Sequence, residues 1–382
     1  MPPIPLLLSA GEASGDMYAA RLAKALQARL DVKIFGMGGP QMRAAGVEII
    51  TDSSEVAVVG ITEILGRLPS LLRAMDRLVS EADHRKPALA ILTDFPGFHL
   101  RLARKLLPRG IRNVYFICPQ FWAWRPWRVR LIRERFVKAL CIFPFEEKFF
   151  RNAGVPTEFI GHPLVGAVSA TQGRAQLCAA QGLDPAGKIV TVLPGSRAGE
   201  LAHHLPILQQ ACAIIHGKVP AQFVVAAAHA QNVERLKEGW PAALTVRVVE
   251  GETYNALAAA DAAIVSSGTA TVEAALLDVP MVVIYKVSAL TATLAGPLVR
   301  TPFFAMVNLI AERKVVPELV QDRFIPKRVA AETLRLLEDA SAREELRSGL
   351  AEVRRKLGPP GAIERAADQI AALLGPGTGN AS

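Results

Sequence analysis

Two α/β domains, each built on a parallel sheet covered by helices, are the fold that this sequence predicts. Three observations predict it. The chain has 382 residues, which is more than one hydrophobic core usually holds. Short apolar runs alternate with helical patterns, and most runs lack the polar alternation of a half-exposed strand. A segment rich in Gly, Pro and Ala, residues 161–187, separates two sets of runs and predicts a domain boundary.

The elements follow in chain order. The first half predicts strands at Ile4–Ser9, Val32–Gly36, Ala88–Thr93, Asn113–Cys118 and Ala139–Phe143. The second half predicts strands at Lys188–Leu193, Gln222–Ala227, Thr245–Val249, Ala262–Ser266 and Pro280–Tyr285. Helical spacing is clearest at Met17–Leu30, Glu200–His216, Thr269–Asp278 and in the tail Pro326–Leu374. Such alternation is typical of doubly wound domains.

Composition and charge exclude disorder over most of the chain, because 51% of the residues are apolar and 21% are charged. The net charge of +9 is concentrated in residues 101–138, which hold eleven Lys and Arg and one acid, Glu134. Trp122, Trp124 and Trp127 lie in the same segment. The segment indicates an anionic partner such as nucleic acid, a membrane surface or a phosphorylated substrate.

We expect a cytoplasmic chain that does not cross a membrane. The four cysteines form no CxxC pair and lie in apolar or helical contexts, which is typical of buried free thiols. No Lys or Arg precedes the short apolar run near the N-terminus, so no secretory signal is predicted. The longest apolar stretch, 279–299, is interrupted by Lys286 and Pro297 and predicts a strand followed by a helix.

Two turns of the first domain hold candidate residues, because ligands of open α/β sheets bind beyond the carboxyl ends of strands. The sequence GEASGD at 11–16 joins the first strand to the first helix, and Ser14 or Asp16 can cap that helix. It is not a GxGxxG dinucleotide fingerprint. Asp94 follows an apolar strand, where a partly desolvated carboxylate can act as a general base or simply close the strand.

Two turns of the second domain predict a phosphate site. In LPGSRAGE at 193–200, glycines let backbone N–H groups approach an anion, and the arginine can bind phosphate oxygens through two bonds. SSGTATVE at 266–273 begins a helix whose N-terminus favours negative charge. Each turn is also compatible with an ordinary capped loop. The candidate binding residues are Gly195, Ser196, Arg197, Ser267, Gly268, Thr269 and Glu273.

Several motifs are missing from the sequence. It has no GxxxxGK[ST], which disfavours a P-loop kinase or ATPase, and no HExxH or metal-spaced Cys/His set. It also has no Asp-x-Asp pair of the kind that metal-dependent sugar transferases often use. We therefore expect no metal and no cofactor, and a bound diphosphate would be neutralised by helix dipoles and Arg197.

The motifs together resemble the lipid A disaccharide synthase family. The segments that carry the resemblance are GEASGD at 11–16, GRLPSLLR at 66–73, TDFPGF at 93–98, CPQFWAWRPWRV at 118–129, FIGHPL at 159–164, LPGSRAGE at 193–200 and SSGTATVEAAL at 266–276. They occur in order, and the resemblance extends to about residue 345. The set is specific, although each segment alone is short.

The resemblance implies a GT-B glycosyltransferase of lipid A biosynthesis, with two Rossmann-like domains, a cleft between them and a C-terminal helix that returns to the first domain. It implies inverting, metal-independent transfer from UDP-2,3-diacylglucosamine to 2,3-diacylglucosamine 1-phosphate. The products are a β-1′,6-linked disaccharide 1-phosphate and UDP, formed at the cytoplasmic face of a Gram-negative inner membrane. We expect an acceptor and membrane-side domain at 1–165, a UDP-sugar domain at 166–345 and returning helices with a frayed end at 346–382.

The resemblance also assigns residues on the acceptor side. Asp94 occupies the position of the family's proposed base, and Glu12 and Ser14 lie in the loop that faces the reacting sugars. Some members have Asp where this chain has Gly97, which leaves Asp94 as the acid on this turn.

On the nucleotide side, Arg197 matches a residue needed for activity, and Glu273 falls where related GT-B enzymes hold the ribose. Asn308 matches a nucleotide-side asparagine.

Two surfaces are candidates for contact with a membrane or with the acceptor. Segment 61–79 has apolar residues at helical spacing, which indicates a core-facing helix. Because Gly66 and Pro69 weaken a regular core helix and the implied substrates are lipids, we favour a membrane-touching element with Leu68, Leu71 and Leu72.

The second surface is the aromatic-basic cluster, in which the candidate contact residues are Trp122, Trp124, Arg125 and Arg128. The other members of the cluster are Trp127, Arg130, Arg133 and Arg135. It can contact lipid headgroups or the acceptor phosphate, or it can be a solvated helix face. No RNA-binding motif accompanies it, so nucleic acid is the least favoured partner. The sequence does not predict an oligomeric state.

Two alternatives stay open. One is another UDP-sugar GT-B enzyme, such as a polyprenyl-linked glycosyltransferase or a UDP-sugar epimerase. The other is a non-catalytic peripheral protein that binds lipid or nucleotide.

Overall fold

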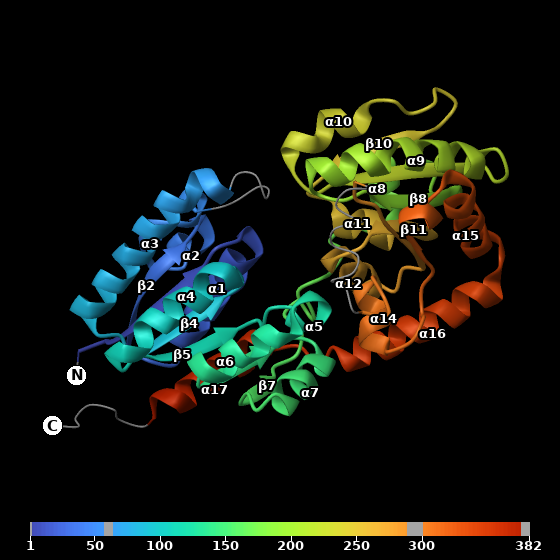
Figure 1. The fold of residues 1–382 in the computed structure, drawn as a ribbon. Helices are drawn as coiled ribbons and strands as arrows, with labels where there is room; N and C mark the ends of the chain where they lie inside the picture. The colour runs from blue at the N-terminus through green and yellow to red at the C-terminus, as the bar shows by residue number, and fades with distance from the viewer. Residues whose placement is uncertain (1, 57–63, 289–300, 376–382) are drawn as a thin grey trace. The chain divides into compact units, whose positions relative to one another are not determined.

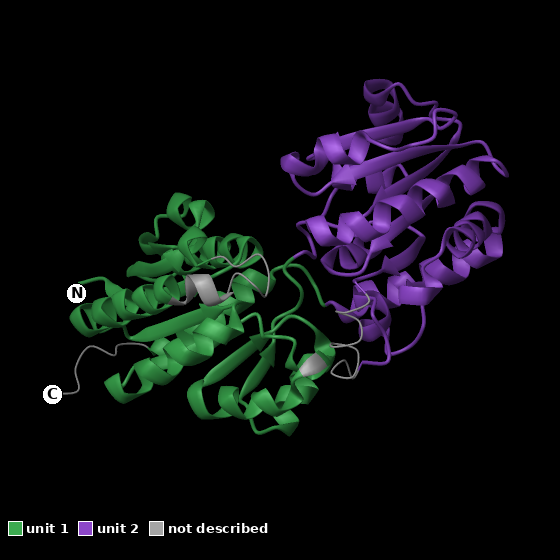
Figure 2. Ribbon diagram, turned by 45° about the horizontal axis from the view of Figure 1, so that its top comes forward, with its two compact units in different colours: residues 1–163, 358–382 green, residues 164–357 purple. Residues whose placement is uncertain are grey.

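The computed structural model describes residues 2–56, 64–288 and 301–375. The chain forms two compact units, one of residues 1–163 and 358–382 and one of residues 164–357 (Figure 2). The part of segment 61–79 before Ile64 and the helix expected after Tyr285 fall outside the described residues.

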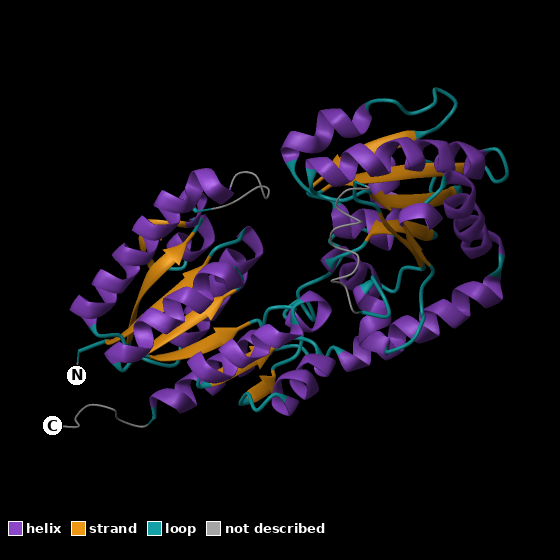
Figure 3. Cartoon of the chain, viewed as in Figure 1, coloured by secondary structure: helices purple, strands orange, loops and turns teal. Residues whose placement is uncertain are grey.

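The first unit is built on a seven-stranded parallel sheet of order β3-β2-β1-β4-β5-β6-β7 (Figures 1 and 3). Its strands are β1 Ile4–Ala10, β2 Val32–Gly38, β3 Glu48–Asp52, β4 Leu89–Thr93, β5 Arg112–Phe116, β6 Lys138–Cys141 and β7 Thr157–Phe159. Its helices are α1 Ala13–Gln27, α2 Pro40–Ala44, α3 Ile64–Arg85, α4 Pro96–Leu106, α5 Phe121–Trp124, α6 Val129–Arg135, α7 Pro144–Asn152 and α17 Ala362–Leu374.

Alternate residues of the central strands enter two apolar layers, so both faces of the sheet are buried. Leu7 and Leu92 point into the layer formed by α3, α4, α6 and α7. Their neighbours Leu6, Leu8 and Ile91 are fully buried but lie outside that layer. Burial on both faces explains why these strands read as continuous apolar runs.

The second unit is built on a six-stranded parallel sheet of order β10-β9-β8-β11-β12-β13. Its strands are β8 Lys188–Leu193, β9 Ala221–Ala227, β10 Val246–Glu250, β11 Ala262–Ser266, β12 Met281–Tyr285 and β13 Glu318–Val320. Its helices are α8 Arg174–Gln181, α9 Ala198–His216, α10 Val233–Lys237, α11 Thr253–Ala258, α12 Thr269–Leu276, α14 Met306–Ala311, α15 Pro326–Glu338 and α16 Ala340–Lys356. All ten predicted strands are present, and the sequence analysis missed β3, β7 and β13.

The end of the second unit lies later than the predicted boundary at residue 345. The reason is that α16 is one unbroken helix to Lys356, and it packs on α12 and α14 of the second unit. Arg354 of α16 donates to the carbonyl of Ala275 at 3.0 Å and pairs with Asp278 at 2.7 Å. Of the predicted returning segment 346–382, only the part from Gly358 onward belongs to the first unit.

Helix α17 completes the first unit by packing against α1. Asp368 pairs with Arg29 at 2.7 Å, and the Arg365 Nε donates to the carbonyl of Ile160 at 2.8 Å. Arg112 donates to the carbonyl of Leu373 at 2.9 Å. The expected return of a C-terminal helix to the first domain is therefore made by α17.

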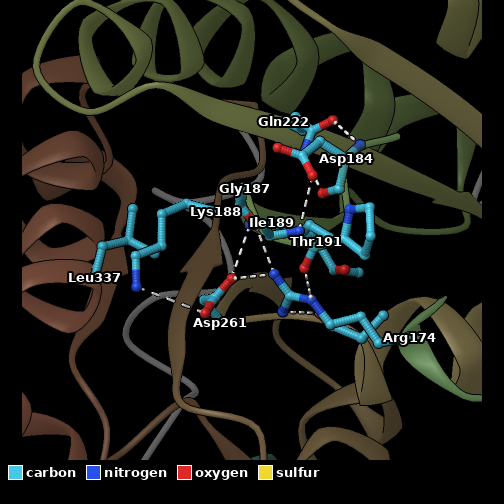
Figure 4. Close-up of polar contacts among 12 residues, drawn as sticks. Arg174, Asp184, Gly187, Lys188, Ile189, Thr191, Gln222, Asp261 and Leu337 are labelled. Atoms are coloured by element: carbon cyan, nitrogen blue, oxygen red, sulfur yellow. Dashed lines mark hydrogen bonds and ion pairs between the residues drawn. The ribbon is translucent and has the colours of Figure 1, made fainter. Parts of the chain in front are cut away.

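A polar cluster closes the amino ends of β8 and β11 (Figure 4). The Asp261 carboxylate accepts from the backbone N–H of Ile189 at 2.9 Å and from Arg174 at 3.1 Å, and it pairs with Lys188 at 3.8 Å. Arg174 also donates to the carbonyls of Ala259 and Gly187. These groups bind one another, so the amino ends of the strands have a structural role. The carboxyl ends of the strands are available for a ligand.

The four cysteines, Cys118, Cys141, Cys178 and Cys212, are buried and free, which confirms the prediction.

Candidate functional site

The candidate site of the first unit lies where β1 and β4 end. These parallel neighbours are in register, with Ala10 opposite Thr93, and the strand order reverses between them. Such a reversal is where open α/β sheets bind ligands. The Asp94 carboxylate accepts from the backbone N–H of Gly11 at 2.8 Å and of Glu12 at 3.1 Å.

A glycine lets this carboxylate approach helix α1. A Cβ atom at Gly15 would lie 1.5 Å from Asp94 Oδ2, so any side chain there would displace the carboxylate. A Cβ at Gly11 would similarly meet the ring of Phe95 at 2.6 Å. The two glycines of the GEASGD turn therefore allow the Asp94 turn to pack closely against it. The sequence alone did not show this role.

The backbone at Asp94 is held in a conformation that L residues rarely adopt. Asp94 has φ 51° and Phe95 has φ 36°, and such residues persist only where the surroundings hold them. Tyr115 Oη donates to the Asp94 carbonyl at 2.7 Å, and His99 Nδ1 lies 3.0 Å from it. Since a carbonyl only accepts, His99 is protonated at Nδ1, and its Nε2 accepts from Ser9 Oγ at 2.8 Å.

Burial controls the protonation of both groups. It lowers the pKa of His99 to about 4, so the ring is neutral and keeps this tautomer. Burial also raises the pKa of Asp94 to about 8. The N–H groups of Gly11 and Glu12 act against the shift, and the charges of Glu12 and Asp16 add to it. A carboxylate with such a pKa can accept a proton near neutral pH.

The other acids and hydroxyls of the first turn have different roles. Glu12 and Ser14 are exposed beside Asp94. The prediction that Ser14 or Asp16 caps α1 is wrong, because Glu12 is the N-cap residue and no side chain caps this helix. Asp16 is buried, and its carboxylate accepts from the N–H groups of Gly39, Gln41 and Met42 at the start of α2.

The second unit contains a cavity of about 530 Å³, a volume typical of small-ligand sites. It lies at the carboxyl ends of β8, β9, β10 and β11, and the strand order reverses between β8 and β11. Seven of the predicted binding residues line it: Gly195, Ser196, Arg197, Ser267, Gly268, Thr269 and Glu273. The sequence analysis missed Thr253 and Tyr254, although both follow the end of β10 and the strand-end rule could have found them.

One wall of this cavity is the N-terminus of α9, where backbone N–H groups bind the carboxylate of Glu200, a residue of the same helix. Glu200 is 11% exposed, and it accepts from the N–H groups of Ser196 at 3.2 Å and Arg197 at 3.4 Å. The Arg197 side chain is 80% exposed and pairs with Glu200 at 3.2 Å. A Cβ at Gly195, where φ is +116°, would lie 2.7 Å from the Glu200 carboxylate. Backbone N–H groups that we predicted for an anion are thus bonded to Glu200.

The opposite wall is the N-terminus of α12, which no side chain caps. Gly268 is its N-cap residue, with φ 144°, and the buried Ser266 Oγ beside it has no hydrogen-bond partner among the described residues. Glu273 accepts from Tyr254 Oη at 3.1 Å, and burial raises its pKa. The uncapped N-terminus of α12, the Ser266 hydroxyl and the Glu273 carboxyl group together suit a phosphorylated ligand that carries hydroxyl groups.

Asn308 does not line this cavity. It is fully buried on α14, where its Nδ2 donates to the carbonyl of Val316 at 3.0 Å and to Glu318 at 2.8 Å. Its Oδ1 accepts from the N–H groups of Val315 and Val316. These bonds hold β13 and the segment before it, and none of them faces the cavity.

Of the predicted membrane-side residues on α3, Leu72 is 54% exposed and Leu71 is half-buried against the core. Among the described side chains of α3, from Pro69 onward, the buried face consists of Ala74, Met75, Leu78, Val79 and Ala82. The helix therefore packs against the core from Ala74 onward and exposes Leu72 just before this part. The side chains of Leu68 and Trp124 lie outside the described part of the structure.

In the aromatic-basic cluster, Trp122 is half-buried and donates to Glu146 at 3.0 Å. Burial raises the pKa of Glu146 to about 7. Arg125 and Arg128 are half-buried, and Trp127 is 58% exposed. The cluster is a fixed part of the unit with an exposed aromatic edge.

Across the described residues, no group of three or more His, Cys, Asp or Glu side chains could hold a metal ion. Of the helices in the described ranges, none is long and apolar enough to cross a membrane.

The fold defines the class of protein first. CalG4, the calicheamicin glycosyltransferase, aligns with a TM-score of 0.61 at 19% identity over 99% of this chain and 100% of its own. The UDP-GlcNAc 2-epimerase from Neisseria meningitidis, solved with UDP-GlcNAc, aligns with a TM-score of 0.65 at 12% identity over 97% and 100%. The chain thus has the GT-B fold.

Sequence comparison then gives the family. The lipid-A-disaccharide synthetase family matches residues 6–372. Lipid-A-disaccharide synthase of Solibacter usitatus is 46% identical over 371 residues, covering 97% of both chains. That of Myxococcus xanthus is 42% identical over 375 residues, covering 97% of this chain and 98% of the relative. The chain belongs to the lipid-A-disaccharide synthase family and is a glycosyltransferase, which confirms the resemblance.

Proposed function

We propose that this chain joins UDP-2,3-diacylglucosamine to 2,3-diacylglucosamine 1-phosphate, forming the β-1′,6-linked lipid A disaccharide 1-phosphate and UDP. Family membership supports the substrates. The observation that carries the chemistry is Asp94, a carboxylate with a raised pKa, fixed at the strand-order reversal of the first unit.

In this proposal the second unit binds the UDP part of the donor. The uncapped N-terminus of α12, with Ser267, Gly268 and Thr269, faces the diphosphate, and Arg197 adds a positive charge. Preorganised donors of this kind typically stabilise a transition state by ~3 kcal/mol each. Glu273 binds a ribose hydroxyl, as its raised pKa and its bond to Tyr254 allow. No metal or cofactor takes part in the proposed transfer.

The first unit supplies the base. Asp94 takes the proton of the acceptor 6-hydroxyl as that oxygen bonds to the anomeric carbon of the donor. The bond from the anomeric carbon to the diphosphate oxygen breaks on the opposite side, so the centre inverts and UDP leaves with the electron pair. Glu12 and Ser14, exposed beside Asp94, bind hydroxyls of the reacting sugars.

We further propose that the protein works at the cytoplasmic face of the inner membrane, as a peripheral protein. The support is the exposed apolar surface of Leu72 on α3, and the exposed Trp127 beside several arginines. Both acylated substrates of the proposed reaction reside in such a membrane.

One assay tests the proposal. The protein is incubated with both acylated sugars, and the products are separated by chromatography. We expect equal amounts of UDP and disaccharide 1-phosphate, and poor activity with a deacylated UDP-glucosamine donor. Equal transfer rates with acylated and deacylated donors would indicate another UDP-sugar enzyme. Formation of an epimerised sugar in place of the disaccharide would indicate the same. Binding of UDP without turnover would indicate a non-catalytic protein.

A further inference from the structure

Three arginines lie next to the Asp94 turn and have no assigned ligand: Arg101 on α4, and Arg125 and Arg128 in the segment that joins α5 to α6. Arg101 Nη1 donates to the carbonyl of Gly97 at 2.9 Å, which fixes it over the turn that follows Asp94. The backbone N–H of Arg128 donates to the carbonyl of Arg125 at 3.0 Å. The same turn therefore holds the last two arginines together.

Aromatic rings hold the Arg128 guanidinium in place. Its Cζ lies 5.4 Å from the ring centroid of Phe121 and 5.9 Å from that of Trp127. Its Nε is buried and has no hydrogen-bond partner among the described residues. Within the same ranges, neither Arg101 nor Arg128 forms an ion pair with a carboxylate. A fixed guanidinium with an unsatisfied donor is typical of a ligand site whose ligand is missing.

The surrounding charges are positive. Burial lowers the pKa of Arg128, and the charges of Arg125 and Arg101 lower it further, while only Tyr115 acts in the other direction. No carboxylate acts on it. Arg101 and Arg128, which have no acidic partner among the described residues, repel each other unless an anion binds between them, and the charge of Arg125 adds to this repulsion. The planar donors of arginine match the oxygens of a phosphate.

We propose that Arg101, Arg125 and Arg128 form a binding site for a phosphate monoester, and that this group is the 1-phosphate of the acceptor. The inference rests on the proposed function, because it places the acceptor against Asp94. Tyr115 connects the two sites, since its hydroxyl donates to the Asp94 carbonyl at 2.7 Å. In the acceptor sugar the 1-phosphate is on C1 and the 6-hydroxyl is on the carbon attached to C5, and C1 and C5 both adjoin the ring oxygen. A single acceptor molecule therefore carries both groups within one sugar ring and can contact both sites.

The test compares two acceptors, 2,3-diacylglucosamine 1-phosphate and its dephosphorylated form. We expect Arg128→Gln to lower kcat/KM about 10- to 100-fold with the phosphorylated acceptor, mainly through KM, as for loss of a charged hydrogen bond. With the dephosphorylated acceptor the loss should stay below about threefold. Arg130→Gln is the matched control, because Arg130 is exposed and also lies over Trp127, at 5.6 Å. It should change neither rate.

Equal losses with both acceptors would overturn the proposal, since they would indicate a structural role, and so would an undiminished rate with the phosphorylated acceptor. Arg128→Lys keeps the charge and should recover part of the loss if the fold is intact. If the wild-type protein turns over neither acceptor, the proposed function fails. The site is then tested directly by titration with glucosamine 1-phosphate, which should bind wild type and not Arg128→Gln.

A second arm separates the acceptor from lipid headgroups. Wild type and Arg128→Gln are sedimented with phosphatidylcholine vesicles, with and without phosphatidylglycerol. We expect both proteins to bind both vesicles equally. Loss of binding to phosphatidylglycerol vesicles in Arg128→Gln alone, with the rates on both acceptors unchanged, would assign the site to headgroups and overturn the acceptor assignment.

Discussion

The two units use equivalent loops. Each loop joins the first strand of its sheet to the helix that follows, β1 to α1 and β8 to α9, and each binds a carboxylate on its backbone N–H groups. In the first unit the carboxylate is Asp94, 83 residues away along the chain from Gly11. In the second unit it is Glu200 of α9, four residues after Ser196 in the preceding loop. Both loops lie where the strand order reverses.

The difference lies in how firmly each carboxylate is held. Asp94 lies in a left-handed turn, and Tyr115 and His99 bind its carbonyl. Its carboxylate fills the space beside Gly15, where a side chain would otherwise lie. Glu200 forms longer bonds, 3.2 and 3.4 Å, within its own first turn, and can leave by a side-chain rotation. This difference predicts that the first loop presents a permanent carboxylate for chemistry, and that in the second loop a bound anion displaces Glu200.

The strongest test of the first half of this comparison is Asp94→Asn. We expect kcat to fall about 10²- to 10⁴-fold, the usual range for losing a general base. UDP affinity should be unchanged, because the cavity proposed to bind UDP is lined by residues of the other unit. UDP release and calorimetric titration with UDP measure the two quantities. Near-normal turnover would exclude Asp94 as the base.

The pH dependence should follow the same carboxylate. Because the active form is ionised and burial raises the pKa of Asp94 to about 8, activity must rise with pH. From pH 6 to pH 8 we expect kcat/KM to increase roughly 50-fold and then to level off. A profile that is flat across this range would contradict the assignment. The residual activity of Asp94→Asn should lack the rise.

Gly15→Ala removes the space that Asp94 occupies, since the added methyl would lie 1.5 Å from its Oδ2. We expect a loss of activity of at least about tenfold and a free energy of unfolding lower by about 1–3 kcal/mol. Gly97→Ala is the matched control, because a Cβ there meets nothing within 4 Å. Rates and thermal unfolding of both variants check this. Equal behaviour of the two would show that the contact with Asp94 does not matter.

The smallest effect is expected for Glu200→Gln, which tests the second half of the comparison. Removing the negative charge from the N-terminus of α9 should leave UDP affinity the same or raise it by a few-fold, most clearly at low salt. The helix should lose about 0.5–1 kcal/mol of stability. Titration with UDP at two salt concentrations measures the effect. A large loss of affinity would show that Glu200 itself binds the ligand.

The sequence predicted the interior strands of both sheets and missed three of the four edge strands. The missed strands β3, β7 and β13 each lie at the edge of a sheet. An edge strand is short and buries less, so its sequence lacks a continuous apolar run. Asp94 was predictable because it follows a buried strand. The left-handed turn and its contacts with His99 and Tyr115 were not, because residues distant in the chain create them.

Local patterns explain the remaining differences. Glu200 stands at the third position of α9, where a glutamate commonly binds the backbone at the start of its own helix. That pattern could have shown that the N–H groups of Ser196 and Arg197 are occupied. For Asn308, a motif match indicated the nucleotide, whereas burial shows that its bonds are all internal. Motifs locate a residue, but only the fold shows what it faces.

The placement of α17 has a consequence for how the protein is made. The first unit is encoded by the start of the chain, but one helix that covers α1 comes from residues 362–374. During translation, domains generally fold as they emerge. Here the early unit must wait, with the apolar surface of α1 uncovered, until the whole second unit has been synthesised. Folding of the base-bearing unit is therefore coupled to completion of the chain, and a prematurely terminated product would lack an intact Asp94 unit.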